Sequence, residues 1–388
     1  MPTRADSEAL RVCLVGELTG GVGVYGKNLI RGLERLGAEL TVITPTPDAS
    51  PAGRSVRVQQ HFGRGRWLPQ ARAFARGLQE APGPYDIVHF TDARFAVFAR
   101  TGANIPLVGT MNDYFYAITG WLKGVGSFHV YQDWVLRHLY YNFTRMVERP
   151  CLRRLDAVLC IAGAVANVLN ECYAIDRGRL HVVPYGIDYG STAVEPIACD
   201  GPMILFAGGN FQRKGLAVLI DAAGAVLKEF PAARFVVLGR SADRDLMRRR
   251  CERAGVHGSF DFVGQVDYAT LYRYYMSARV FTMPSLLEAF GLPYLEAMYC
   301  GLPVVASNAA GPDEYLRDGS NCLVVPAGSV TELANAILKL LRDDVFAAHL
   351  IEGGKRTAQE FAVHQMAART LEAYRTVIAR ANAGFHRT

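Results

Sequence analysis

The sequence predicts an α/β protein made of two doubly wound domains, each a parallel sheet covered by helices on both faces. Three observations lead to this prediction. The chain has 388 residues, which favours two domains of about 150 to 200 residues over one core. Short apolar segments alternate with amphipathic segments in the first half, as expected for strands joined by helical crossovers. The same alternation starts again after residue 202.

The first half contains five apolar segments of strand length, each bounded by glycine, proline or polar residues. They cover 11–17, 38–44, 85–90, 105–111 and 157–162. A helix is predicted over 24–37, because Leu29, Ile30 and Leu33 recur at helical spacing and Gly37 can cap the end. Strands and helices in this order predict a parallel sheet.

The second half repeats the pattern. Strands are predicted over 203–209, 233–239, 260–264, 280–284, 302–307 and 321–326, with a helix over 215–230 and a long final helix over 361–384. We expect an N-terminal domain over 1–190, a second domain over 191–365 and a C-terminal helix over 366–388 that braces the domains. Ligands of such sheets bind outside the carboxyl ends of the strands, so we expect the site between the domains.

The composition is that of a soluble globular protein, with 50% hydrophobic and 20% charged residues. We find no apolar run of membrane-spanning length and no apolar core of signal-peptide length near the start, so we expect a cytoplasmic protein. The eight cysteines form no C-x-x-C pair and the nine histidines no H-x-x-x-H pair. Reduced thiols and the absence of a protein-built metal site are therefore expected.

The net charge of +6 is concentrated in the first half. Residues 1–190 carry 21 basic and 16 acidic side chains, a net of +5, and the remainder carries 21 and 20, a net of +1. Two segments, 54–77 and 120–155, combine arginine with aromatic residues. These segments suit a surface that contacts an anionic membrane face or a phosphate-bearing acceptor. The alternative is a basic helix face that is packed on the sheet. No nucleic-acid-binding module is present.

The most informative stretch is PSLLEAFGLPYLEAMYCGLPVVAS, residues 284–307. Glu288 and Glu296 are eight residues apart and flank the predicted start of a helix, where Pro293 suits the first position. The amides of Phe290, Gly291 and Leu292 are then helix-start donors, which together with the helix dipole favour a diphosphate. The two carboxylates can accept hydrogen bonds from the hydroxyls of two sugars.

This stretch resembles the E-x7-E signature of the retaining GT-B glycosyltransferases of family four, the group 1 glycosyltransferases. GGVGVYGKNL, YDIVHF, VPYGID, AGGNFQRKG and NAAGPDEYLRDGSNCLVVP resemble further segments of the same family in the same order. The resemblance therefore spans most of the chain. It implies a GT-B fold, two facing Rossmann-like domains with the sugar nucleotide in the cleft between them.

The resemblance also implies roles for residues of the second domain. Arg213 and Lys214, at the start of a helix that follows a strand, would neutralise the departing diphosphate. Glu296 would hold the ribose hydroxyls of the nucleotide, and Glu288 would meet the transferred sugar. The amides of Phe290 and Gly291 would assist at the sugar, and that of Leu292 at a phosphate. Val266, in the turn VGQV, would lie near the base.

The first domain departs from the family pattern after the strand PLVGT. Relatives often carry histidine there, commonly followed by aspartate, whereas this chain has Asn112 and Asp113. An amide can hydrogen-bond a sugar hydroxyl but cannot titrate near neutrality. Asp113 is the remaining candidate for holding the donor or acceptor, or for receiving the acceptor's proton. An Asn-Asp turn without such a role is the alternative.

The stretch LTGGVGVYGKN contains Gly21-x-Gly23-x-x-Gly26, the glycine spacing of a dinucleotide-binding turn. Such a turn needs an acidic residue at the end of the following strand, and the end of that strand, TVITPTP, has none. We therefore interpret Gly21 and Gly23 as a backbone lid that approaches the donor phosphates and the sugar, rather than as the seat of a redox cofactor.

These observations predict a retaining hexosyltransferase that moves a sugar from a nucleotide diphosphate to a hydroxyl of a glycan, lipid-linked or small-molecule acceptor. No D-x-D motif is placed to bridge a diphosphate, so we expect no metal and no cofactor beyond the donor substrate. A nucleotide-sugar epimerase, a nicotinamide-dependent oxidoreductase and a non-catalytic sugar-nucleotide-binding protein are the alternatives. Peripheral contact with the inner face of an anionic membrane is an additional expectation.

Overall fold

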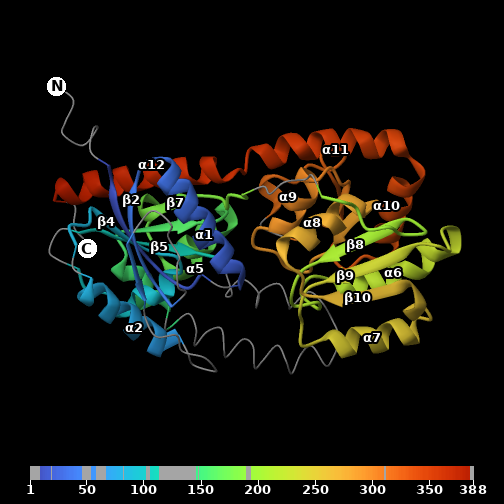
Figure 1. The fold of residues 1–388 in the computed structure, drawn as a ribbon, viewed down its shortest axis with the longest axis horizontal. Coiled ribbons are helices and arrows are strands. Elements are labelled where there is room, and N and C mark those ends of the chain that lie inside the picture. The colour runs from blue at the N-terminus through green and yellow to red at the C-terminus, as the bar shows by residue number, and fades with distance from the viewer. Residues whose placement is uncertain are drawn as a thin grey trace. The chain divides into compact units, whose positions relative to one another are not determined.

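The computed structural model describes residues 9–18, 20–45, 54–57, 67–81, 83–101, 105–112, 146, 148–188, 194–309 and 312–384. The chain divides into two compact units, which are described separately (Figure 1). Unit 1 comprises Met1–Gly186 together with Val363–Thr388, and unit 2 comprises Ile187–Ala362. The final helix of the chain therefore belongs to unit 1.

Unit 1 is built on a seven-stranded sheet in the order β3-β2-β1-β4-β5-β6-β7, with every pair of neighbours parallel. Its strands are β1 (Arg11–Val15), β2 (Glu39–Thr44), β3 (Arg54–Arg57), β4 (Ile87–Phe90), β5 (Leu107–Met111), β6 (Ala157–Cys160) and β7 (Leu180–Val182). The five strands predicted in this half are confirmed, and β3 and β7 are additional. The strand order reverses direction between β1 and β4, which makes the sheet doubly wound.

Helices cover both faces of this sheet. They are α1 (Gly20–Arg35), α2 (Trp67–Glu80), α5 (Gly163–Tyr173) and α12 (Val363–Asn382), with the 3-10 helices η2 (Ala93–Phe98) and η4 (Arg177–Arg179). Helix α1 packs on α12, and α2 lies on the opposite side of the sheet (Figure 1). A Cβ at Gly32 would come within 2.7 Å of the Ala367 Cβ, so glycine allows α1 and α12 this close contact.

The glycine-rich segment forms part of helix α1, not a turn in front of it. The predicted start near residue 24 is therefore wrong by one helical turn, since α1 begins at Gly20. A Cβ at Gly23 would lie 2.2 Å from the carbonyl carbon of Leu18. The close approach that requires glycine at this position is made to the chain's own preceding loop.

A buried chain of polar side chains ties α12 to the sheet. His89 of β4 contacts the Tyr374 hydroxyl of α12 at 2.5 Å through Nδ1 and the Thr110 hydroxyl of β5 at 2.7 Å through Nε2. The Tyr25 hydroxyl of α1 in turn lies 2.8 Å from Thr110 Oγ1. Burial lowers the pKa of His89 to about 3, so the imidazole is neutral in the folded protein at neutral pH.

We expect His89 to make the fold sensitive to acid. Below pH 6.5, the ordinary pKa of histidine, the unfolded chain binds a proton on His89 that the folded chain does not. The free energy of unfolding then falls by about 1.4 kcal/mol per pH unit as the pH drops from 6.5 toward 3. Urea unfolding of wild type and His89→Gln, above and below pH 6.5, should show a smaller loss in the variant. An identical pH dependence would contradict this assignment.

Unit 2 is built on a six-stranded sheet in the order β10-β9-β8-β11-β12-β13, again with parallel neighbours. Its strands are β8 (Met203–Ala207), β9 (Arg234–Leu238), β10 (Phe260–Gly264), β11 (Val280–Met283), β12 (Val304–Ser307) and β13 (Leu323–Val325). All six predicted strands are confirmed. The strand order reverses between β8 and β11, the point at which doubly wound sheets bind ligands.

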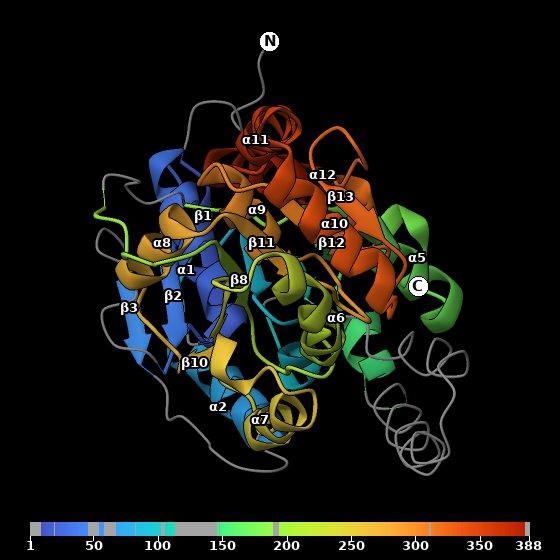
Figure 2. The same ribbon diagram turned by 90° about the vertical axis from the view of Figure 1, so that its right-hand side faces the viewer.

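Figure 2 shows α6 and α10 on one face of this sheet and α8 and α9 on the other. The helices of unit 2 are α6 (Leu216–Glu229), α7 (Arg244–Arg253), α8 (Tyr268–Ser277), α9 (Leu292–Tyr299), α10 (Val330–Arg342) and α11 (Asp344–Gln359), with η5 (His257–Ser259) and η6 (Pro312–Glu314). Helix α6 packs against α10, and α9 against α11. Both faces of the sheet are therefore covered, which leaves the strand ends for a site.

Within the described ranges, no helix has the length and apolar character needed to cross a membrane. The same residues contain no group of three or more histidine, cysteine or acidic side chains arranged to hold a metal ion. All eight cysteines are free thiols, and most are buried.

Candidate active site

The candidate site lies at the carboxyl edge of the unit 2 sheet, where β8 and β11 are neighbours. The loop after β8 covers 208–215 and the loop after β11 covers 284–291. After β8 the chain continues to β9 on one side, and after β11 it continues to β12 on the other side. The loops that follow β8 and β11 therefore diverge and leave an opening between them. Five of the residues predicted to bind a sugar nucleotide lie in these two loops, namely Arg213, Lys214, Glu288, Phe290 and Gly291.

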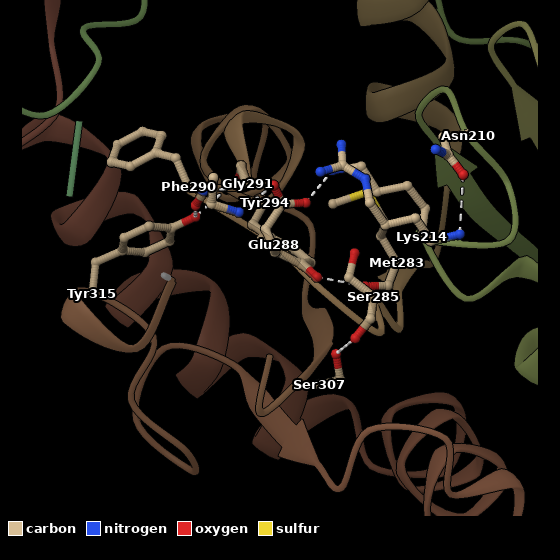
Figure 3. A network of polar contacts seen from close by, with 12 residues as sticks. Asn210, Lys214, Met283, Ser285, Glu288, Phe290, Gly291, Tyr294, Ser307 and Tyr315 are labelled. Carbon is tan, nitrogen blue, oxygen red and sulfur yellow. Dashed lines mark hydrogen bonds and ion pairs between the residues drawn. The ribbon is translucent and has the colours of Figure 1, made fainter. Parts of the chain in front are cut away.

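The loop after β8 is a tight turn that presents Arg213 and Lys214. Asn210 adopts a left-handed conformation with φ 52°, which asparagine tolerates better than most residues. Its carbonyl accepts the Lys214 N–H at 3.0 Å and its side-chain oxygen accepts the Arg213 N–H at 3.2 Å (Figure 3). Asn210 thus shapes the turn that places the two cations.

Glycine allows the two loops to meet. Gly215 has φ 76° and precedes α6, and a Cβ there would come 1.8 Å from the Pro284 carbonyl oxygen. Any side chain at this position would push the loops apart. The Leu286 N–H also donates to the Arg213 carbonyl at 2.8 Å. Backbone contacts therefore set how closely the two loops approach.

Lys214 and Glu288 form an ion pair across the reversal point, with Lys214 Nζ donating to Glu288 Oε2. The two side chains are 10% and 6% exposed. Both residues were singled out from the sequence, but as separate ligands of a donor. The structure brings them together as partners.

Several groups hold the Glu288 carboxylate in its charged form. Burial opposes ionisation and raises the pKa, but the Lys214 ammonium, the nearby Arg213 charge and the Ala289 N–H outweigh it and leave the pKa below its usual value. The Ala289 N–H donates to Glu288 Oε1 at 3.0 Å. Glu288 is therefore a carboxylate at neutral pH, fixed by contacts on both of its oxygens.

The start of helix α9 is shaped by Gly291 and Tyr315. Gly291 is the N-cap with φ 84°, and the Tyr315 hydroxyl donates to the carbonyls of Phe290 and Gly291 at 2.5 and 3.0 Å (Figure 3). The Phe290 N–H points to Glu288 Oε1 at 3.5 Å. The sequence predicted this amide as a hydrogen-bond donor to the ligand, whereas it faces the Glu288 carboxylate. Leu292 is the first residue of the helix.

Glu296 is the fifth residue of α9 and lies in its second turn. Its side chain is buried, and Oε2 accepts a hydrogen bond from the Tyr275 hydroxyl of α8 at 3.0 Å. Burial raises the pKa of Glu296, and the Tyr275 hydrogen bond offsets part of that rise. Glu296 therefore loses its charge at a higher pH than an ordinary glutamate does.

The remaining predicted residues belong to other segments of the chain. Val266 is half-buried in the loop between β10 and α8. Gly21 and Gly23 lie in the first turns of α1, and Asn112 follows β5, all three in unit 1. Asp113 lies outside the described residues.

Asn112 is anchored on both sides of its amide. Its Nδ2 donates to the Thr91 carbonyl after β4 at 2.7 Å, and its Oδ1 accepts the Tyr185 hydroxyl at 2.6 Å. The Tyr185 ring packs against Tyr25, with the ring centroids 4.9 Å apart. The side chain therefore joins the ends of β4 and β5 to the segment that leaves unit 1, a use that the sequence did not suggest.

Three tyrosines that position the predicted residues were missed, namely Tyr185, Tyr275 and Tyr315. Tyr268, Tyr272 and Tyr275 recur at helical spacing, and this stripe was a signal that a hydroxyl could face inward from α8. Tyr185 and Tyr315 contact residues far along the chain, and no local pattern marks them.

Comparison with known proteins gives two family matches. Residues 191–357 match the family described as glycosyl transferases group 1, and residues 19–190 match that described as glycosyltransferase family 4. The chain is 31% identical to the phosphatidyl-myo-inositol mannosyltransferase of Mycobacterium tuberculosis, over 93% of this chain and 94% of that protein. It is 29% identical to the D-inositol 3-phosphate glycosyltransferase of Xylanimonas cellulosilytica, over 92% and 91%.

Among solved structures, the fold is similar to that of the sucrose-phosphate synthase of Thermosynechococcus elongatus. The TM-score is 0.76 at 24% identity, and the match covers 95% of this chain and 99% of that one. The architecture is the two-domain GT-B fold expected from the sequence.

Proposed function

Because the chain belongs to the group 1 glycosyltransferases of family 4, we propose that it transfers a sugar from a nucleotide diphosphate to a hydroxyl acceptor with retention at the anomeric carbon. Its family favours glycosyl transfer over the epimerase and oxidoreductase alternatives. The observation that carries the proposal is the buried Lys214–Glu288 pair where the strand order reverses. It fixes a cation and a carboxylate at the edge where such sheets bind nucleotides.

In the proposed reaction, the bond between the anomeric carbon and the diphosphate oxygen breaks, and the acceptor oxygen bonds to the same face of the carbon. The acceptor's proton passes to the leaving phosphate. Arg213 and Lys214 stabilise the negative charge that grows on the diphosphate. Since these charges are supplied by side chains fixed in a tight turn, we propose that no metal ion is required.

The two glutamates are proposed as hydroxyl ligands rather than nucleophiles. Glu288 is already bound by Lys214 and the Ala289 N–H, so its oxygens are oriented before the sugar arrives. Glu296, buried and held by Tyr275, is proposed to accept hydrogen bonds from the ribose. The names of both relatives contain inositol, which makes inositol phosphates the first acceptors to test here.

A thermal-shift screen of nucleotide sugars tests the proposal. A ligand that binds only the folded protein raises the melting temperature in proportion to the logarithm of its concentration. We expect one nucleotide diphosphate sugar to give a clear shift, and that compound is then the donor for assays of transfer. A flat response to the uridine, guanosine, adenosine and thymidine diphosphate sugars would contradict the proposed donor class.

Glu296→Gln should weaken binding of the nucleoside diphosphate by about 10- to 100-fold, the value of a hydrogen bond to a charged group. Since burial raises the pKa of Glu296, wild-type affinity should fall as the pH drops through that raised pKa, while the variant stays flat. Titration calorimetry over a pH series measures both effects. Glu252→Gln, at an exposed site on α7, is the control, and equal affinities in all three proteins would refute the role.

A further inference from the structure

Unit 1 carries a second candidate site, a surface pocket of about 580 Å³ bordered by α2 and the segment that ends η2. This volume is within the range of about 300–1,000 Å³ that is typical of ligand pockets. Arg72 and Arg76 line it from α2, and Phe98 and Arg100 line it from the other side. None of these residues belongs to the donor site of unit 2.

Three guanidinium groups line the pocket. Within the described part of the chain, Arg72, Arg76 and Arg100 form no ion pair, and no acidic side chain lines the pocket. Glu80 lies one turn beyond Arg76 but forms no ion pair with it. Arg72 and Arg76 are four residues apart on one helix face, where like charges repel. The cluster thus concentrates positive charge without internal compensation.

The pocket is also held in shape. The Arg72 guanidinium carbon lies 5.1 Å from the centroid of the Phe98 ring. This cation–π contact orients the N–H donors of the guanidinium group. Beneath it, Phe74 of α2 and Phe95 of η2 meet edge to face with ring centroids 5.0 Å apart. These contacts fix α2 and η2 together, so a ligand would not have to assemble the site.

We propose that this pocket binds a phosphate group, carried either by an anionic lipid headgroup or by a soluble phosphate compound. Guanidinium groups match phosphate oxygens two at a time, which lysine cannot do. Leu68 lies four residues before Arg72 on the same face of α2 and is 39% exposed. An exposed apolar side chain beside arginines also suits a lipid surface. The inference does not depend on the proposed glycosyl transfer.

The test compares wild type with the triple variant Arg72→Gln, Arg76→Gln, Arg100→Gln. The matched control is Arg249→Gln, Arg253→Gln, Arg356→Gln, which removes the same charge from exposed positions of unit 2. One arm measures co-sedimentation with phosphatidylcholine vesicles that do or do not contain phosphatidylglycerol, at physiological ionic strength. The other arm measures binding of inorganic phosphate by calorimetry. Melting temperatures confirm that all three proteins are folded.

We expect the pocket variant to bind about a hundredfold more weakly than wild type, given the contribution of each basic residue near an anionic surface, and the control variant to stay close to wild type. Binding to anionic vesicles alone identifies a lipid headgroup as the ligand, and binding of inorganic phosphate as well identifies the phosphate group itself. The proposal is overturned if wild type binds neither probe, or if the pocket and control variants lose affinity equally.

Discussion

Lys214→Met is expected to lower the free energy of unfolding by about 3–5 kcal/mol and to abolish transfer, because it leaves a buried carboxylate without its partner. Glu288 is 6% exposed at its side chain, and Lys214 is its buried counter-ion. Since the pair lowers the pKa of Glu288, its contribution is present at neutral pH and is lost as the pH falls through that lowered pKa. Chemical unfolding at neutral pH measures the loss.

The double variant Lys214→Met, Glu288→Gln separates stability from activity. It removes both charges, so no unpaired ion remains buried, and we expect most of the lost stability to return. Activity should stay absent, because the cation proposed to face the diphosphate and the carboxylate proposed to face the sugar are both missing. A single Lys214→Met variant as stable as wild type would show that the ion pair is not the organising contact of this edge.

Arg213→Ala is expected to reduce the rate of transfer by about 10²–10³ at saturating donor, the usual effect of removing one preorganised donor to a developing charge. Arg213 lies beside Lys214 in the Asn210 turn, where its N–H is held by Asn210 and its backbone carbonyl accepts the Leu286 N–H of the other loop. The loop should therefore survive the substitution. Initial rates with the donor found by thermal shift measure the effect.

Two variants of the same turn control this experiment. Arg213→Lys keeps the positive charge but loses the planar guanidinium group, so an intermediate rate is expected. Gln212→Ala changes an exposed neighbour whose contacts to the described residues are made by its backbone N–H and carbonyl, so its rate should equal that of wild type. Wild-type turnover by Arg213→Ala would remove the arginine from the mechanism.

The sequence predicted the architecture well because its signals are local. Strands buried on both faces are short apolar runs, and all six strands of unit 2 were recognised from such runs. The start of α9 was predicted to within one residue from Pro293, which was expected at the first position and lies second, after Leu292. The residues predicted to face a diphosphate were therefore named together with the helix start that they flank.

What the sequence could not predict depends on contacts between distant residues. Lys214 and Glu288 are 74 positions apart, so their pairing appears only when β8 and β11 become neighbours. The start of α1 was misplaced because three glycines have poor helix propensity. Packing of Gly23 against Leu18 overrides that propensity in the folded protein.

The stereochemistry of the first product tests the central proposal most directly. The donor found by thermal shift is incubated with the protein, with or without an inositol phosphate acceptor, and the anomeric proton of the newly formed product is followed by NMR before it can equilibrate. We expect the released or transferred sugar to keep the anomeric configuration of the donor, at a rate that depends on Arg213 and Lys214. A product of inverted configuration, or wild-type rates in both cation variants, would contradict retaining transfer at this site.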